Sequence, residues 1–529
     1  MVVASTAVIV ACLIAASSAF GPILPNRHLL VHSASFKLLP VPATPMPTAT
    51  AARFPTTLGL SPTTLMGVEV GGSCRPTYWL VRILFIRALS LLTFTTFLMS
   101  YRQTKQLIGD DAILPLANVI KRPVNPSRPV LSIFRYLKPP YNRTIDRLSL
   151  LGMLLSLIHL ATGTASLLTL LPLLAIHVSF QSVGSVFYAF GWESFMYELL
   201  CITALMCPLT PKRHITLPVP SATIYLFRWL LFRVLLGSGL IKLHSGDKKW
   251  RDLTTMNYFY ETQPLPNPLS PVLHRLPKAY HKLETLTNHF IELVVPFFLL
   301  APTRFLPIAG AINVVFQLVL IASGNLSYLN HLTILPALFC FNDEIIGFLF
   351  STATQSQAII AEYVSQQAAT GLFGATGWVR WLVNAAAAGV TAKLSVPVLQ
   401  NMFSKSQIMN TSFDKFRLVG SYGAFGSVST TRTELVVLGA NDASGPWREY
   451  KFKAKAGDVD KPLRFLSPYL YRLDWLMWIA TFGGLERNPW VLRLLLMFAR
   501  NDGSVDKLLE RNPFEGEGEV SWRRERESG

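Results

Sequence analysis

Long apolar segments alternate with short polar, Pro-rich connections along most of this chain. The segment Tyr78 to Ser100 has about the 20 residues that a helix needs to cross the hydrocarbon core of a bilayer. Further apolar segments occupy residues 148–180, 190–207 and 225–243. The stretch 148–180 is long enough for one span and a second, partial or re-entrant piece. The connection after Ser100, up to Arg147, is polar and rich in Pro, which predicts loop.

The second half of the apolar region contains shorter segments. Residues 290–301 and 305–322 are separated by Pro302 and Arg304, so they predict an antiparallel pair. Residues 332–341 and 345–350 are each below bilayer length and suit interfacial or re-entrant pieces as well as spans. A last candidate covers 378–396. We therefore expect a mainly α, polytopic transmembrane bundle of about five to eight spans across residues 77–400.

The character of the chain changes after residue 400. Strand-like runs at 434–438 and 447–455 and helical patterns at 471–482 and 490–498 predict an extramembrane α+β domain over residues 401–514. The tail, 515–529, is highly charged and expected to be disordered.

The N-terminus has the features of a targeting region. Residues 1–19 combine a short apolar run with small residues before Phe20, as in a signal peptide. Residues 20–76 predict a transit-like segment or a disordered linker, because Phe20 to Val68 contains no acidic residue. The sequence Ser18 to Pro22 is similar to the junction in bipartite presequences of algae with complex plastids. A plastid destination therefore remains an alternative.

Composition supports a membrane protein. Hydrophobic residues make up 51% of the 529, charged residues 15%, and the mean hydropathy is +0.37, whereas charge in soluble domains is about a quarter of the residues. The net charge of +18 is carried mostly by single Lys and Arg between apolar segments, so no nucleic-acid partner is expected and anchoring at membrane faces is favoured. The five cysteines form no metal-binding motif, and neither a metal nor a cofactor is expected.

Charged residues inside the apolar segments are the first candidate chemistry. Arg228, Arg233 and Lys242 share one segment that contains no acid, and an unpaired charge at bilayer depth costs at least about 2.5 kcal/mol. Acidic partners are expected from other segments, and the candidates are Glu193, Glu198 and Glu292. Such pairs either fix helix packing or form a polar binding site.

The polar and aromatic block from His244 to Pro268 is the second candidate. It presents acids and amphipathic aromatic side chains suited to a membrane face, but no set of nucleophile, base and orienting group is recognisable. Gly237 and Gly239 lack the surroundings of a phosphate loop and indicate close helix contact instead. Asn142 and Asn410 are possible glycosylation sites by their sequence pattern.

Several long motifs follow one another along the chain. They are LIGD (107–110), FGWES (190–194), the block 228–268, NHFIELVVPFF (288–298), SGNLSYLN (323–330), YGAFGS (422–427), SPYLYRLDWLMW (467–478) and NPF (512–514). In this order they resemble the lipase maturation factor family of multi-pass endoplasmic reticulum membrane proteins. The resemblance covers about residues 78–514.

The resemblance implies a folding factor, not an enzyme, that helps secreted lipases or other client proteins to fold and assemble, with membrane lipids as its surroundings. It implies that a loop between spans and the C-terminal domain serve client recognition. Candidates in the loop are Trp250, Asp252, Tyr258, Tyr260, Glu261, Pro264 and Pro266; those in the C-terminal domain are Tyr422, Arg472, Asp474 and Trp475.

Two other classes of function remain open. A plastid membrane assembly factor would fit the N-terminal extension. A membrane-embedded enzyme acting through Lys242 or His244 would fit a distant similarity to the vitamin K-dependent carboxylase type.

Overall fold

The fold was analysed in a computed structural model of the chain. The structure describes residues 76–122, 129–210, 217–301, 304–369, 374–442, 444–458, 460–501, 503–516 and 521–528. The predicted signal peptide, the transit-like segment and the plastid-type junction lie outside these residues, so the predictions made for them stay predictions.

The first half of the described chain is helical. Its α-helices are α2 (Trp79–Ile108), α3 (Leu116–Ile120), α4 (Asn142–Thr162), α5 (Leu167–Val183), α6 (Gly191–Met206), α7 (Ser221–His244), α8 (Lys248–Arg251), α9 (Met256–Thr262) and α10 (Ser270–His274). Short 3-10 turns occupy Ile133–Tyr136 and Ser185–Tyr188.

The second half adds further helices and all of the strands. The helices are α11 (Lys278–Leu293), α12 (Val295–Phe298), α13 (Leu306–Ser323), α14 (Leu329–Ala337), α15 (Asp343–Ile346), α16 (Thr352–Ala369), α17 (Gly374–Met402), α18 (Arg472–Ala480), α19 (Gly484–Arg487) and α20 (Pro489–Arg500). The strands are β1 (Thr411–Ser412), β2 (Gly420–Ser421), β3 (Thr433–Ala440), β4 (Arg448–Glu449), β5 (Lys451–Phe452), β6 (Leu509–Arg511) and β7 (Ser521–Ser528).

Five helices in the described part of the chain are long and apolar enough to cross a membrane: α2, α4, α7, α13 and α17. The count becomes six if Leu329–Cys340 and Asp343–Leu349 are taken together as one broken span. The chain bends by 117° between these two segments. This count agrees with the predicted helical bundle and with the lower part of the predicted range of spans. The two short segments expected at 332–341 and 345–350 are the two arms of this bend.

Local chemistry explains where the ambiguous stretch 148–180 is divided. Helix α4 ends at Gly163, whose φ of 66° is left-handed and therefore suits glycine. Helix α5 begins after Ser166, whose side chain forms a capping box with Thr169. The sequence contained both signals, but neither stood out among the other Gly, Ser and Thr residues nearby.

The boundaries of α2 and α4 differ from the sequence prediction, and the segment predicted at 290–301 is divided between α11 and α12. Helix α2 continues through Tyr101 to Ile108, a stretch that was expected to be loop. Helix α4 already begins at Asn142, inside the Pro-rich region, because Asp110 accepts hydrogen bonds from the backbone N–H groups of Tyr141 and Asn142 at 2.9 and 3.0 Å. This carboxylate from the LIGD motif satisfies donors that a helix start leaves unpaired.

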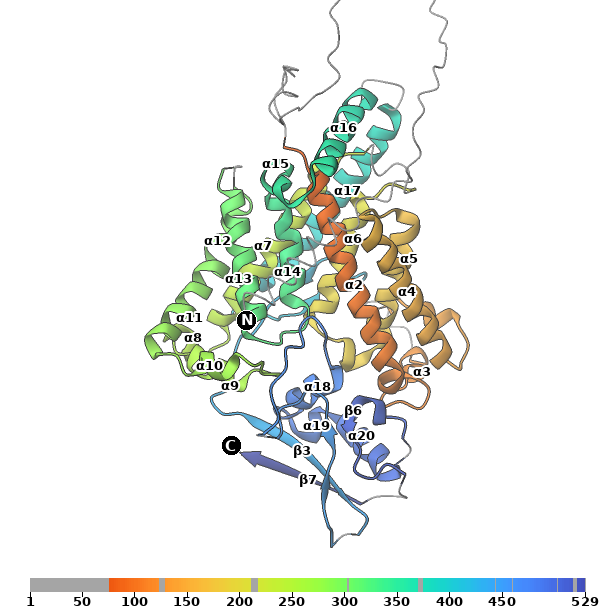
Figure 1. Ribbon diagram of the computed structural model, residues 1–529, viewed down its shortest axis with the longest axis vertical. Helices are drawn as coiled ribbons and strands as arrows, with labels where there is room; N and C mark the ends of the chain where they lie inside the picture. Colours follow the sequence, from red (N-terminus) through yellow and green to blue (C-terminus); the bar gives the residue numbers. More distant parts are fainter. Residues whose placement is uncertain are drawn as a thin grey trace, which may run out of the picture. The chain divides into compact units, whose positions relative to one another are not determined.

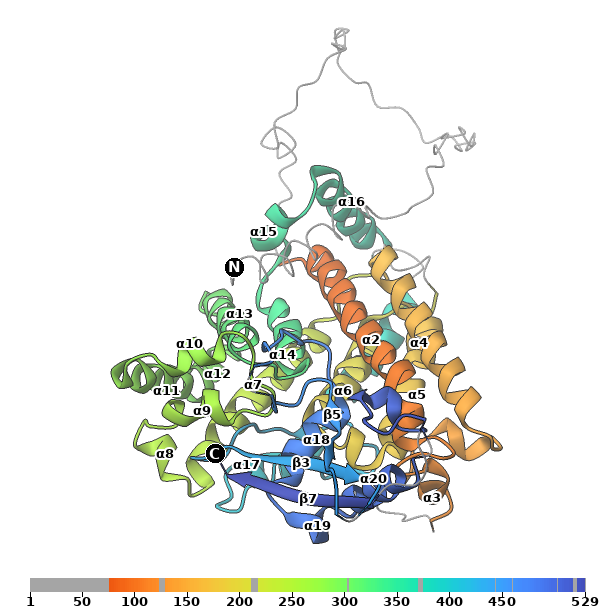
Figure 2. The ribbon, with the colours of Figure 1, turned by 60° about the horizontal axis from the view of Figure 1, so that its bottom comes forward.

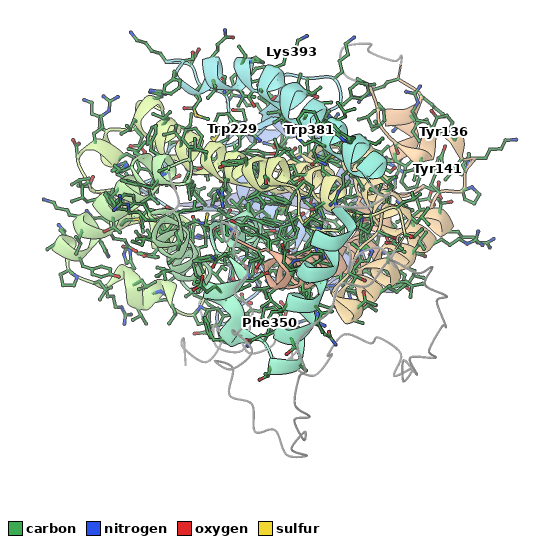
Figure 3. All side chains as sticks on the ribbon, turned by 90° about the horizontal axis from the view of Figure 1, so that it is seen from above. Tyr136, Tyr141, Trp229, Phe350, Trp381 and Lys393 are labelled. Carbon is green, nitrogen blue, oxygen red and sulfur yellow. The ribbon has the colours of Figure 1, made fainter. Side chains whose placement is uncertain are left out.

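The helices pack around α2 and α7. Helix α2 makes its largest contact with α4, and α7 contacts α6, α11, α14 and α17. Figure 1 shows the C-terminal elements α18, α19, α20, β3 and β7 gathered at one end of the bundle. Viewed from above, α17 with Trp381 and Lys393 runs along the outside of α7, and Trp229 of α7 donates a hydrogen bond to Ser395 at 2.9 Å (Figure 3).

The C-terminal domain is α+β, as expected. A three-stranded antiparallel sheet has the order β4-β3-β7, and two small two-stranded sheets pair β1 with β2 and β5 with β6. Figure 2 shows β3 and β7 side by side. The tail expected to be disordered thus contains β7, because its backbone pairs with the full length of β3 from Thr433 to Ala440.

A glycine in α7 permits the close approach of the C-terminal domain to the bundle. A Cβ added at Gly237 would lie 2.4 Å from the carbonyl oxygen of Tyr422, well inside van der Waals contact. Gly239 allows a similar approach of Leu293 and Glu292 on α11. The prediction of close contact at these glycines therefore holds, with the C-terminal domain as one of the neighbours.

We expect Gly237→Ala to destabilise the junction by about 1–3 kcal/mol, the usual cost of overpacking. Thermal unfolding of the purified full chain in detergent, followed by limited proteolysis of residues 403–410, measures the effect. Gly389→Ala in α17 is the matched control, because a Cβ there meets nothing within 4 Å. Equal behaviour of the two variants would contradict the close contact.

Candidate functional site

Helix α6 carries a buried carboxylate that reaches the C-terminal domain. Glu193 and Arg472 are both fully buried, and Arg472 Nη2 lies 2.6 Å from Glu193 Oε1. The guanidinium also donates to the Phe187 carbonyl oxygen at 2.8 Å and lies 3.8 Å above the Tyr188 ring. Charge, hydrogen bond and ring contact together compensate the burial of this arginine.

A second carboxylate of α6 repeats the arrangement. Glu198 forms an ion pair with Arg233 of α7, and both are buried. Its other oxygen accepts hydrogen bonds from the Gly420 backbone N–H at 3.0 Å and from the Tyr422 hydroxyl at 2.7 Å. Arg233 in turn donates to the Gly420 carbonyl oxygen at 2.7 Å. Two helices and the start of the C-terminal domain therefore share one polar cluster.

The third buried pair joins α7 to α11. Lys242 donates to Glu292, and their side chains are 5% and 7% exposed. The ammonium group lies 5.0 Å from the centre of the Trp250 ring. The pair does not line either of the two cavities described below, so helix packing is the role that the geometry supports.

Arg228 differs from Arg233, Lys242 and Arg472, because the contacts of its guanidinium are with neutral groups. Its guanidinium donates to the Phe339 carbonyl oxygen at 2.9 and 3.0 Å and to the Tyr78 hydroxyl at 3.1 Å. The Tyr225 ring lies 5.4 Å away. None of the three expected acids pairs with Arg228, because Glu193, Glu198 and Glu292 pair with Arg472, Arg233 and Lys242.

The loop candidates divide by exposure. Trp250, Tyr260 and Pro264 are buried, Tyr258 and Pro266 are partly exposed, and Asp252 and Glu261 are exposed. Trp250 donates from its indole N–H to the Phe425 carbonyl oxygen at 3.1 Å, and Tyr260 donates from its hydroxyl to Glu284. These two aromatic residues thus shape the loop from inside, and only the exposed members are available to a partner.

Arg432 fastens the same loop to the C-terminal domain. Its guanidinium donates to the carbonyl oxygens of Glu261 and Gln263 at 2.8 and 2.7 Å, and it pairs with Glu434. From the other side, Asn325 accepts from the Leu466 backbone N–H at 2.8 Å and donates to the Pro266 carbonyl oxygen at 3.2 Å. The loop is therefore held by several neutral and charged bonds.

An open cavity of about 640 Å³ lies between this loop and the C-terminal domain. Its aromatic lining comes from Phe259, Phe425, Trp478 and Phe482; its polar lining includes Asp247, Lys249, Ser427 and Ser429. Phe482 is 55% exposed and contacts Trp478 edge to face at 4.7 Å. The volume falls within the range of about 300–1,000 Å³ that is usual for ligand sites.

Asp247 fixes the polar side of this cavity. It accepts from the backbone N–H groups of Val428 and Lys249 at 3.0 and 3.1 Å and pairs with the Lys249 ammonium at 2.9 Å. Burial acts to raise its pKa, but the hydrogen bonds from Lys249 and Val428 outweigh it and lower the pKa below its ordinary value. Asp247 is therefore ionised near neutral pH and holds the loop around Val428.

The other C-terminal candidates are mainly structural in their contacts. Asp474 accepts from the backbone N–H groups of Ala454 and Lys455 at 2.6 and 2.9 Å, and burial raises its pKa to about 6. Trp475 meets the Trp192 ring edge to face at 5.2 Å, which joins the FGWES motif to α18. Tyr422 and Arg472 bind the two glutamates of α6.

The possible glycosylation sites differ in their surroundings. Asn410 is exposed in the connection after α17. Asn142 starts α4, and its side-chain oxygen accepts from the Asp110 backbone N–H at 3.1 Å, so its side chain is committed to the helix start. We therefore retain Asn410 as the better acceptor.

Sequence reasoning missed the side chains that line the cavity. Phe425, Trp478 and Phe482 fall in motifs or predicted helices, but nothing in their local pattern indicates that they meet Phe259 of a distant loop. Among the described residues, no three His, Cys, Asp or Glu side chains are grouped to hold a metal ion.

Comparison with known proteins matches both halves of the chain. The family model described as Lipase maturation factor transmembrane domain matches residues 80–348, and that described as Lipase maturation factor C-terminal domain matches 418–527. Lipase maturation factor 1 of Homo sapiens is 41% identical over 470 residues, which cover 84% of this chain and 82% of the relative.

Further relatives cover a similar part of the chain. Lipase maturation factor 1 of Bos taurus is 40% identical over 468 residues, with 84% of this chain and 83% of the relative covered. Lipase maturation factor 2 of Homo sapiens is 26% identical over 546 residues, with coverage of 82% and 77%. No solved structure matches the chain.

The Lys242–Glu292 pair allows a test of structural against functional roles. We expect Lys242→Met to destabilise the protein by about 3–5 kcal/mol, because it leaves Glu292 buried without its cation. Replacing both residues by Met should recover most of the stability, as measured by thermal unfolding of the full chain in detergent. A Lys242→Met protein with unchanged stability but abolished function would contradict the packing role and favour a binding or catalytic one.

Proposed function

The chain belongs to the lipase maturation factor family, and from this premise we propose that it is a membrane-bound factor that helps secreted lipases to fold and assemble in the endoplasmic reticulum. The observation that carries the proposal is the open cavity of about 640 Å³ between the segments matched by the two family models. Phe259 comes from the first segment, and Phe425, Trp478 and Phe482 come from the second.

The lining of the cavity suits a segment of an incompletely folded protein. Aromatic side chains such as Trp478 and Phe482 bind exposed apolar groups, and they do so with little loss of side-chain entropy. Asp247, Lys249 and the serines at 427 and 429 offer hydrogen bonds to a polypeptide backbone. Binding of this kind is reversible and requires no covalent chemistry, which fits assistance to folding.

The exposed loop residues extend this surface. Asp252 and Glu261 lie on the same loop as the cavity-lining Phe259, so a client bound at the cavity would pass near two carboxylates. We assign Trp250, Tyr260 and Arg432 to holding the loop in place, and Phe482 with its neighbours to client contact.

Client maturation by the protein tests the proposal. Cells of the source organism from which this gene has been deleted would be complemented with the wild-type chain, with Phe482→Ser, or with Phe416→Ser. Phe416 is the matched control, because it is 57% exposed in the C-terminal domain but does not line the cavity. The readout is the specific activity of secreted lipases, with the amount of each protein determined separately.

We expect deletion to lower the specific activity of secreted lipase and the wild-type chain to restore it. Phe482→Ser should restore less lipase activity than the wild-type chain, because the loss of one aromatic contact weakens client binding about tenfold, or by about 1.4 kcal/mol, and Phe416→Ser should restore it like wild type. Unchanged lipase activity after deletion would overturn the function. Equal complementation by both variants would overturn only the assignment to this cavity.

A further inference from the structure

A second, smaller cavity of about 80 Å³ lies where the end of α2 meets the C-terminal domain. Its lining is strongly cationic. It includes Arg102 of α2, Lys453 after β5 and Lys507 before β6. The volume exceeds that of one or two waters but is too small for a peptide side chain with its backbone.

The cations of this small cavity stand apart from the other lysines of the domain. Three nearby lysines form ion pairs within the described structure: Lys451 with Asp458, Lys455 with Glu434, and Lys461 with Glu510. The ammonium of Lys453 instead donates a hydrogen bond to a neutral group, the carbonyl oxygen of Lys507. Lys453 therefore lacks the close salt bridge that each of the other three lysines forms.

Asp474 is the one carboxylate that lines the small cavity, and backbone N–H groups already donate hydrogen bonds to it. It is 1% exposed and accepts two backbone N–H bonds, from Ala454 and Lys455. No salt bridge joins it to Arg102 or Lys507 among the described residues. Burial raises the pKa of this carboxyl, and Lys453 is near enough for its charge to act against that rise. Three cations and one carboxylate leave the cavity with an excess of positive charge.

Neutral donors complete the lining. The hydroxyl-bearing rings of Tyr469 and Tyr471 lie 5.0 Å apart. Burial raises the pKa of Tyr469 above its ordinary value, and the hydrogen bond from Gln103 and the nearby Arg102 charge offset this only in part. Gln103 donates to the Tyr469 hydroxyl at 3.2 Å and to the Leu470 carbonyl oxygen at 2.8 Å. The Tyr469 hydroxyl accepts the bond from Gln103, so its own proton can be donated to an anion.

The position of Arg102 along α2 indicates at which level of the membrane the cavity lies. Helix α2 has 30 residues and is therefore about 45 Å long, whereas the hydrocarbon core is about 30 Å thick. Arg102 follows Trp79 by 23 residues, or about 35 Å, which is the distance to the headgroup layer. Tyr101 and Tyr136 are 39% and 89% exposed, and Tyr136 lies at the outer edge of the bundle in Figure 3.

From these observations we propose that the cavity of Arg102, Lys453 and Lys507 binds a phosphate group at the membrane surface. A tetrahedral phosphate fits the volume, offsets the excess charge and accepts hydrogen bonds from the lysines and tyrosines. The group belongs either to an anionic phospholipid or to free phosphate. Because Arg102 is on the bundle and the lysines are on the C-terminal domain, the bound phosphate links the two.

The test uses the full chain reconstituted in nanodiscs of phosphatidylcholine with or without phosphatidylglycerol, and radiolabelled inorganic phosphate in a separate binding assay. Co-purified phosphatidylglycerol is quantified by mass spectrometry after exchange into detergent. The variants are Lys453→Gln with Lys507→Gln, and Arg102→Gln alone in case the first fails to fold. Lys451→Gln is the matched control, because it removes a lysine of the same domain that does not line the cavity.

We expect the double lysine variant to lose about 30-fold in phosphate-group affinity, which corresponds to about 2 kcal/mol for two lysines near the membrane surface. Lys451→Gln should bind as wild type. Selective retention of phosphatidylglycerol assigns the phosphate to a lipid, and binding of inorganic phosphate alone assigns it to a free ion. Failure of the wild-type chain to bind either probe, or equal binding by wild type and the cavity variants, would overturn the proposal.

Discussion

Two carboxylates buried on helix α6 impose the constraint on which the rest of the structure depends. Glu193 and Glu198 lie inside the protein, where an unpaired charge would cost several kcal/mol, so each must meet a cation. Glu193 forms an ion pair with Arg472. Glu198 forms an ion pair with Arg233 and accepts hydrogen bonds from Tyr422 and Gly420. Both clusters include the C-terminal domain. That domain is therefore part of the fold of the bundle and not an appended module.

This constraint also explains where the large cavity lies. Once the C-terminal domain is fixed to α6 and α7, its loop around Phe425 and the end of α18 face the loop that follows α7. The residues that carry the family resemblance are mostly found in these contacts: Trp192, Asn325, Tyr422 and Arg472 hold the parts together. Phe482 is left exposed by the same arrangement, so a binding surface results from a scaffold built of buried ion pairs.

Much of this architecture could be predicted from the sequence. The remainder depends on contacts between residues that lie far apart in the sequence. The apolar segments along the chain predicted the helical bundle. The segment that contains Arg233 and Lys242 has no acid, which indicated acidic partners on other helices. The partner of Glu193 was missed, because Arg472 lies 279 residues later in a segment that reads as an ordinary amphipathic helix. The cavity was missed for the same reason. The start of α4 depended on Asp110, a helix cap supplied from outside the helix.

Site-specific photocrosslinking in living cells tests the central claim most directly. A photoreactive amino acid would replace Phe482 in one strain and Phe348, which is 81% exposed and does not line the cavity, in another. The account predicts a covalent adduct with a newly made secreted lipase at Phe482 and none at Phe348. Adducts at Phe348 alone, or at both positions to the same extent, would contradict a client site between the bundle and the C-terminal domain.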